Sequence, residues 1–269
     1  AWRHGSHAAE EARRIEHGRF REGDSVRTIC LALACLVLST PSAAQSAGLA
    51  YSDNFVVMAP DQPLADEVRD AAEGLRKQVA LEWLGAELPA GKGRTVISVN
   101  VVEAANRGLT WLIDHPKRKM HSTWLTTSRS GATGPLLAHE MVHVVLGTYF
   151  PEGLPAWANE GIASLQDGPK RDAIRGRILA SWVRDGNWPE IAEVLGAPTL
   201  PGSDQRAYAV AVSLTRYLLT RGDKPQFLRF AVEAKEQGWD EALRTHYRIQ
   251  SVQQLQAAWQ GWVGRRSAP

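Results

Sequence analysis

The chain has 269 residues, of which 44% are hydrophobic and 22% are charged. This composition is typical of a globular protein, and it excludes the disordered, collagen-like and coiled-coil classes. The formal net charge is only +2 and no block of basic residues stands out, which argues against a nucleic-acid-binding role.

A short apolar segment near the amino terminus predicts export. Residues 29–38 form an uncharged apolar run that is too short to cross a bilayer as a helix. The run follows a basic residue and leads into small residues ending at Ala44, so we expect a signal peptide cleaved before Gln45. The alternatives are a buried segment of the folded domain or lipidation at Cys35. We therefore predict that residues 1–44 are a removed leader and that the protein works in the periplasm or outside the cell.

The predicted leader contains both cysteines, Cys30 and Cys35, so the mature chain would carry neither a thiol nor a disulfide. Without the leader the basic and acidic residues nearly balance, so attraction to an anionic membrane surface is not expected. We also predict no stable membrane span after the signal is removed.

Residues 45–130 are predicted to mix strands with one helix. The helix covers residues 61–84 and is stopped by Gly85. The residues at 114–119 are rich in basic side chains and predict a solvated loop, and we expect His115 and His121 to be loop residues. Strands are expected where β-branched residues gather or alternate, at Asn54–Met58, Thr95–Val102 and Ser122–Ser128. The last of these is polar on one side, which predicts an edge strand.

Residues 131–269 are predicted to be almost entirely helical. The first helix, Leu136–Leu146, is apolar nearly all round and is therefore expected to be central and buried. The following helices are expected at Pro155–Gln166, Lys170–Arg184, Trp188–Leu195, Gln205–Thr220, Pro225–Glu236, Asp240–Arg248 and Val252–Val263. We predict an α+β fold in a single domain, with a small mixed sheet lobe followed by a mainly helical lobe and the central helix between them.

The central helix carries the motif H-E-x-x-H, from His139 through Glu140 to His143. Two histidines four residues apart project from one helical face and can bind one cation. Glu140 is rotated by about 100° from His139, so it can reach a water molecule on the metal without being a ligand. Burying these polar groups in so apolar a helix without a partner would cost several kcal/mol, about the penalty for unpaired buried polar groups, and a metal removes that cost.

A catalytic zinc ion usually has three protein ligands and a water molecule, so a third ligand must follow His143. The next histidine is His246, too far along the chain for a continuous motif. Glu160 lies on the following predicted helix, and a turn after Gly147 could fold that helix back against the first. Glu152 competes with it but sits in the turn itself, so we favour Glu160.

These motifs resemble those of the gluzincin zinc metallopeptidases, and specifically their peptidase MA-like branch. The resemblance rests on H-E-x-x-H followed by W-x-N-E-G at Trp157–Gly161, and it covers roughly residues 122–167. It implies a zincin-like fold in which His139, His143 and Glu160 bind one zinc ion and Glu140 is the general base. It also implies that a peptide substrate lies extended along the edge strand.

The sequence departs from the thermolysin-like pattern at one supporting position. Ser164 stands where those enzymes have the aspartate that contacts a zinc-binding histidine, so Ser164 or Asp167 is expected to support His139. The candidates for a hydrogen-bond donor to the substrate oxyanion are Tyr208, His246 and Tyr247. The G-x-M-E-N signature of the aminopeptidase branch is absent, which favours an endopeptidase.

The sequence thus predicts an exported zinc metallopeptidase that acts on peptides or proteins. The alternative is a catalytically silent zinc-binding or scaffolding module of the cell envelope. The presence of Glu140 favours the enzyme, because a structural zinc site has no need of a base beside its ligands.

Overall fold

The computed structural model describes residues 47–91, 95–115 and 118–267. The predicted leader over residues 1–44 lies outside the described residues. Within these ranges the fold is mixed α+β, as predicted, with a five-stranded mixed sheet and a larger set of helices. No helix in them has both the length and the apolar content needed to cross a bilayer.

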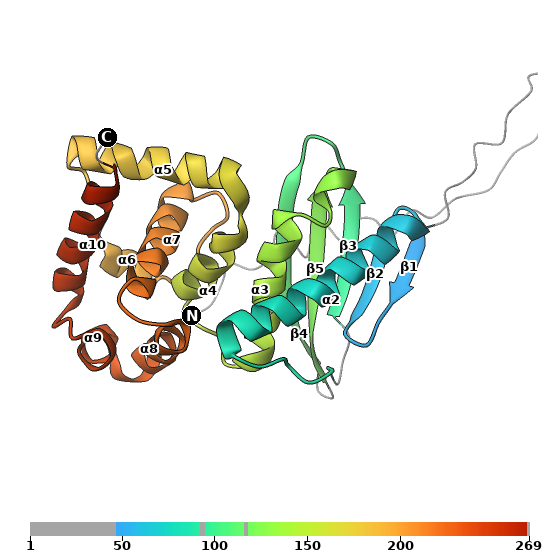
Figure 1. The fold of residues 1–269 in the computed structure, drawn as a ribbon, viewed down its shortest axis with the longest axis horizontal. Helices are drawn as coiled ribbons and strands as arrows, with labels where there is room; N and C mark the ends of the chain where they lie inside the picture. Colours follow the sequence, from blue (N-terminus) through green and yellow to red (C-terminus); the bar gives the residue numbers. More distant parts are fainter. Residues whose placement is uncertain (1–46, 92–94, 116–117, 268–269) are drawn as a thin grey trace, which may run out of the picture. The chain divides into compact units, whose positions relative to one another are not determined.

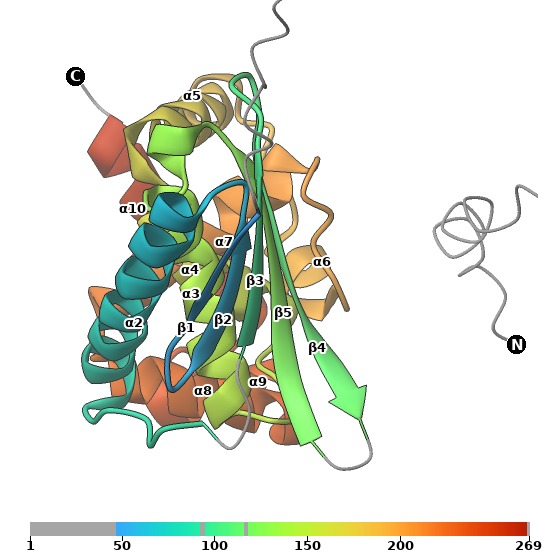
Figure 2. The same cartoon turned by 90° about the vertical axis from the view of Figure 1, so that its right-hand side faces the viewer.

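The sheet has the strand order β1-β2-β3-β5-β4 (Figure 2). The two inner junctions, β2 with β3 and β3 with β5, are parallel, whereas the outer strands β1 and β4 run antiparallel to their neighbours. The strands are β1 Gly48–Tyr51, β2 Phe55–Ala59, β3 Thr95–Val101, β4 Asn106–His115 and β5 Arg118–Thr127. Strands β1 and β4 were not predicted from the sequence.

The edge strand on the site side is β4, not the predicted Ser122–Ser128, which lies in β5 between β3 and β4. The prediction of loop positions for His115 and His121 was also wrong, since His115 ends β4 and His121 lies within β5 opposite Leu112. The polar residues of β5 led to the wrong prediction of an edge strand, although some of them are buried. Thr123 is buried, and its hydroxyl lies 2.9 Å from that of Thr110 on β4. Hydroxyl pairs of this kind satisfy polar side chains inside a sheet.

Helices α2 (Gln62–Leu84) and α3 (Pro135–Tyr149) pack on the same face of the sheet (Figure 1). Helix α2 begins at Asp61, whose carboxylate accepts from the backbone N–H of Leu64, and it ends at Gly85 in the left-handed conformation. Such caps satisfy backbone groups that the helix leaves free. Between the helices and the sheet lies a core that includes Phe55, Leu64, Ile97, Leu125 and Met141.

The remaining helices enclose a second core that is rich in aromatic side chains. Trp83, Trp157, Trp182 and Trp259 are all fully buried there. The helices of this part are α4 Ala156–Ala163, α5 Gly168–Asp185, α6 Ile191–Gly196, α7 Gln205–Leu219, α8 Lys224–Gln237, α9 Trp239–Tyr247 and α10 Val252–Ser267. The predicted helix Pro155–Gln166 ends earlier as an α-helix, and a short 3-10 turn (η2, Ser164–Gln166) completes it.

Helix α3 belongs to both cores. Leu137 and Met141 pack into the sheet core, whereas Val142 and Val145 pack into the helical core. A helix that is apolar on two sides leaves only a narrow stripe for polar groups, and His139 and His143 occupy it. The two cores therefore fix the direction in which these histidines point.

Candidate metal centre

The two histidines of the H-E-x-x-H motif lie one turn apart on α3 with their rings close together. The ring centroids of His139 and His143 are 4.9 Å apart, with His139 buried and His143 partly buried. The spacing follows from the helix geometry, which places residues i and i+4 on one face.

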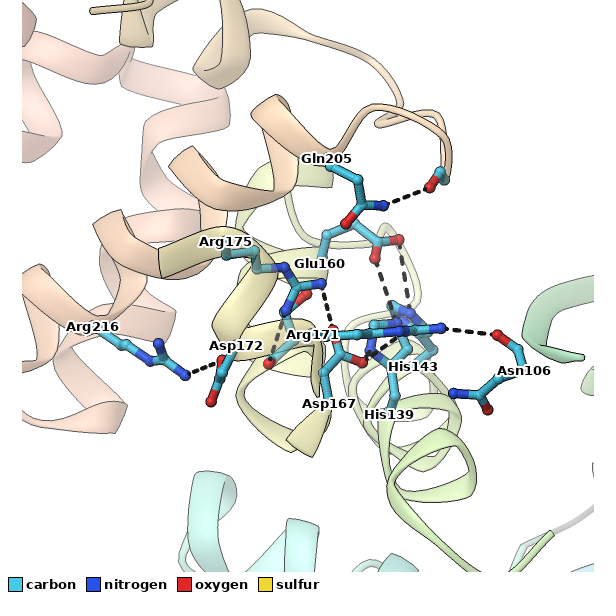
Figure 3. Close-up of polar contacts among 12 residues, drawn as sticks. Asn106, His139, His143, Glu160, Asp167, Arg171, Asp172, Arg175, Gln205 and Arg216 are labelled. Carbon is cyan, nitrogen blue, oxygen red and sulfur yellow. Dashed lines mark hydrogen bonds and ion pairs between the residues drawn. The ribbon is translucent and has the colours of Figure 1, made fainter. Parts of the chain in front are cut away.

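Glu160 reaches both histidines from α4, the next helix along the chain (Figure 3). Its two carboxylate oxygens lie 3.6 Å from Nε2 of His139 and 3.7 Å from Nε2 of His143. One donor atom from each of the three residues falls within 4.8 Å of the others. Two ligand atoms on one tetrahedral zinc ion are about 3.4 Å apart, as its bond lengths require, so these three side chains have the separations of a zinc ligand set.

The polar atoms of the site also fit a metal ion. Oε2 of Glu160 is buried and has no hydrogen-bond partner among the described residues. Such an atom is costly unless a cation or water molecule meets it. Glu152, the competing ligand from the sequence, is exposed in the turn before α4 and is not part of this group, and its backbone carbonyl accepts from Lys235.

Glu140 lies beneath the edge strand. Its side chain is buried and packs against Gly108 of β4, where any larger residue would collide with the carboxylate. Oε2 of Glu140 has no hydrogen-bond partner among the described residues. Gly108 therefore gives the carboxylate room beside the histidines, at the point where the strand passes the site.

Asp167 contacts Nδ1 of His139, the ring nitrogen that does not face Glu160. Its carboxylate oxygen lies 2.9 Å from Nδ1 of His139, in a charge-assisted contact rather than a well-aligned hydrogen bond. Of the two candidates from the sequence, Asp167 occupies the supporting position, while the buried hydroxyl of Ser164 has no partner among the described residues. Carboxylates placed in this way orient a metal-binding imidazole.

Asp167 also pairs with Arg171 and Arg175 on α5 (Figure 3). Burial alone would raise the pKa of the Asp167 carboxyl, but His139 and the two arginines hold it well below its usual range. Burial would likewise lower the pKa of His139, but the carboxylates of Asp167 and Glu160 raise it to about 9. Without a metal ion, His139 is thus a cation at neutral pH.

The three predicted oxyanion donors lie in different surroundings, and one of them is at the site. Tyr208 lines the cavity at the histidines, and burial together with the Glu160 carboxylate raises the pKa of its phenol. His246 instead pairs with Glu233 at 2.8 Å, and Tyr247 is buried against Phe230. Of these three side chains, only Tyr208 faces the site.

His121 is a site residue that the sequence did not identify. It is buried, lines the cavity with His143, and lies against Gly147, where there is no room for a side chain. Burial, with a smaller contribution from His143, lowers the pKa of its imidazole. Its alternation with Thr123 and Leu125 in the sequence would have placed it on the buried face, had the strand been extended to Arg118.

The site lies between two adjoining hollows along β4. One has a volume of about 340 Å³ and includes Leu109, Leu112 and His121 in its lining, and the other has about 420 Å³ and includes Arg107 and Arg171. Both are lined by Gly108, His139, Glu140, Gly202 and Tyr208. The potential reacting groups therefore sit at the junction, with room for a ligand on each side.

Comparison of the chain with protein-family models, with curated proteins and with solved structures finds no match in any of the three.

Proposed function

We propose that the protein is an exported zinc metallopeptidase of the gluzincin type, with a zincin-like arrangement of sheet, central helix and glutamate helix. The observation that carries the proposal is the convergence of His139, His143 and Glu160, with the carboxylate of Glu140 close by. Two imidazoles and a carboxylate are a ligand set typical of catalytic zinc. Export is proposed on the leader pattern in the sequence alone.

The remaining groups have distinct tasks in this proposal. Bound zinc would polarise the scissile carbonyl group and acidify a water molecule. Glu140 accepts the proton of the attacking water and passes it to the leaving amine. Tyr208 stays protonated because its pKa is raised, so its O–H can donate a hydrogen bond to the carbonyl oxygen as negative charge develops.

The substrate strand is proposed to pair with β4. No strand of the described residues pairs with the outer edge of β4, and Gly108 brings its backbone directly over Glu140. An extended peptide can add to such an edge through main-chain hydrogen bonds. The assignment replaces the stretch at Ser122–Ser128, whose two edges are both occupied by neighbouring strands.

The decisive test compares Glu140→Gln with His139→Ala. Glu140→Gln keeps the size of the side chain but cannot accept a proton at neutral pH, so bound zinc should be unchanged while peptide hydrolysis falls at least about 10²-fold. His139→Ala should lose zinc and hydrolysis together. Bound zinc is measured by elemental analysis and hydrolysis by digestion of an unbiased peptide library. A parent protein that binds zinc but cleaves no peptide would favour the scaffolding alternative.

A second pair of variants tests the third ligand. Glu160→Ala should abolish most zinc binding because it removes the only carboxylate of the three-residue group. Glu152→Ala is the matched control, since Glu152 is an exposed residue of the turn preceding the same helix. Equal zinc occupancy in the two variants would contradict the assignment.

A further inference from the structure

The larger hollow beside the site is rich in arginine. Arg171 and Arg175 project from α5 one turn apart, and Arg107 comes from β4 next to Gly108. The other half of the cleft is lined instead by apolar residues, among them Leu109, Leu112 and Leu200. The two sides of the reacting groups therefore differ in chemistry.

The positive charge of this hollow exceeds the negative charge that faces it. The carboxylates here are Glu140, which lines the hollow, and Asp167, which pairs with both Arg171 and Arg175 and is shared with His139. Arg175 is 2% exposed, and its Nε–H has no hydrogen-bond partner among the described residues. Arg107 forms no ion pair or hydrogen bond within that part of the chain. Arg107 is exposed, whereas Arg171 is partly buried and Arg175 is buried, and these two share one carboxylate. An anion that joins them would offset the cost of burying their charge.

The hollow has a defined position relative to the proposed reaction. Glu140 lies under Gly108, so along β4 a bond cleaved there has Arg107 towards one end and Leu109 towards the other. The side chains of Arg107 and Leu109 leave the strand on the face opposite to Glu140, because neighbouring residues of a strand alternate. A peptide that pairs antiparallel with β4 runs from the Leu112 end towards the Asn106 end. The residues after the scissile bond then lie in the arginine half, and those before it lie in the apolar half.

We propose that the arginine half of the cleft binds a carboxylate of the substrate, located one or two residues after the scissile bond. The inference rests on the proposed peptidase function and names its substrate class. The carboxylate belongs either to an acidic side chain or to the carboxyl terminus of a short peptide. Both sources offer the planar oxygen pair that a guanidinium group binds through two parallel hydrogen bonds.

Cleavage of a peptide library tests the preference. The library contains each sequence with Glu, Gln or Lys after the varied bond, and with a free carboxyl terminus or a carboxamide. The parent should prefer the carboxylate in at least one of the two arms by about tenfold or more, typical of a charge-assisted hydrogen bond, and the arm that responds identifies the source. Arg107→Gln should reduce this preference, and Arg107→Glu should reverse it in favour of Lys.

The matched control is Arg184→Gln on the same helix as Arg171, because Arg184 is exposed and pairs only with its neighbour Asp185 among the described residues. It should keep the full preference of the parent. Cleavage without any preference for a carboxylate, or an unchanged preference in Arg107→Glu, would overturn the inference while leaving the peptidase proposal intact.

A binding measurement separates this inference from the proposed function. Zinc-loaded Glu140→Gln is titrated by calorimetry with acetyl-Ala-Leu-Ala-Glu-Ala-amide, with its Gln counterpart, and with the Gln peptide bearing a free carboxyl terminus. At least one carboxylate peptide should bind about tenfold more tightly than the Gln amide, and this advantage should shrink at high salt. Equal affinities of all three peptides would refute the carboxylate site, whether or not the parent cleaves peptides.

Discussion

Asp167 joins His139 to two arginines in a buried network, so its charge matters for both metal binding and stability. Asp167→Asn keeps the shape of the side chain but removes the charge that holds the His139 ring. Loss of such a supporting carboxylate typically costs 10- to 100-fold in metal affinity, and we expect a decrease of about this size in a zinc titration.

The same variant should also lower the free energy of unfolding. Arg175 is left as a buried cation without its carboxylate, and breaking a buried pair of this kind costs about 3–5 kcal/mol. Asp172→Asn is the matched control, because Asp172 forms a more exposed pair with Arg216 and should cost less than about 1 kcal/mol. Urea unfolding measures both. Equal losses would mean that the Asp167 network adds no more stability than a surface ion pair.

Because the pKa of His139 is raised, the stability of the metal-free protein should fall with rising pH, whereas its affinity for zinc should rise. In the metal-free protein the folded pKa of about 9 exceeds the usual 6.5, so the protonated ring stabilises the fold below about pH 6.5. That contribution is lost as the pH rises to 9. Zinc must displace this proton, so its apparent affinity should rise over the same range.

Unfolding of the metal-free protein and zinc titrations between pH 6.5 and 9 check these two trends. In His139→Ala the decrease in stability over this range should be reduced, because the titrating ring is gone. A metal-free parent whose stability rises from pH 6.5 to 9 would contradict the assignment of the proton to His139.

Site residues could be predicted from the sequence where they lie close together in the chain. His139, Glu140 and His143 lie within five residues, and their relative placement follows from helix periodicity alone. Arg107 and His121 could not be predicted in this way, because their proximity to the motif depends on the pairing of β4 with β5 and on the packing of α3 against these strands.

At the scale of elements, the position of Glu160 depends on close packing between α4 and α7. Gly161, next to Glu160, lies where a Cβ atom would meet the hydroxyl of Thr215 and the backbone carbonyl of Ala211. The backbone cannot move out of the way without shifting α7. Gly161→Ala should therefore lower the free energy of unfolding by about 1–3 kcal/mol, as overpacking does, and weaken zinc binding through displacement of α4.

Gly176→Ala is the control for replacing a helical glycine where the added methyl group meets no neighbouring atom. Gly176 is exposed in the interior of α5, and nothing lies within 4 Å of an added Cβ atom. This substitution should stabilise the protein by about 0.5–1 kcal/mol, because alanine loses less chain entropy in a helix. Similar effects of the two substitutions in thermal unfolding would show that α4 and α7 are not packed closely.

The helices could be predicted from the sequence because most have an apolar face, and several also begin at an aspartate that caps the first turn. Strand β4 could not, because its alternating residues Leu109, Trp111 and Ile113 are exposed rather than packed in a core. The stretch at Ser122–Ser128 in its partner β5 was then predicted to be an edge strand, because it is polar on one side. A buried strand whose polar residues hydrogen-bond to those of a neighbouring strand lacks the apolar pattern by which buried strands are predicted.

At the scale of the whole domain, the proposed ligands connect elements that both cores hold in place. Helix α3 contributes to both cores, while Glu160 comes from the helical part. Zinc at 100 times its dissociation constant should stabilise the fold by about 2.7 kcal/mol, the value that mass action gives. For a domain of this size the melting temperature should rise by about 5–10 °C.

Circular dichroism melts with zinc and with a chelator measure this change. Glu140→Gln should show the same shift as the parent, because Glu140 is not a proposed ligand. His139→Ala should show none. A shift of equal size in His139→Ala would place the zinc ion elsewhere on the protein.

The distribution of tryptophan gives the two cores different optical properties. The helical core contains Trp83, Trp157, Trp182 and Trp259, whereas the sheet core contains no tryptophan. On the sheet, Trp111 and Trp124 are partly exposed, with their ring centroids 6.2 Å apart across β4 and β5. Intrinsic fluorescence thus reports mainly on the helical core, and it reports on the sheet only through the Trp111–Trp124 pair on β4 and β5. Replacing both of these residues with Phe would leave a protein whose fluorescence follows the helical core and whose far-ultraviolet spectrum follows the backbone of both parts.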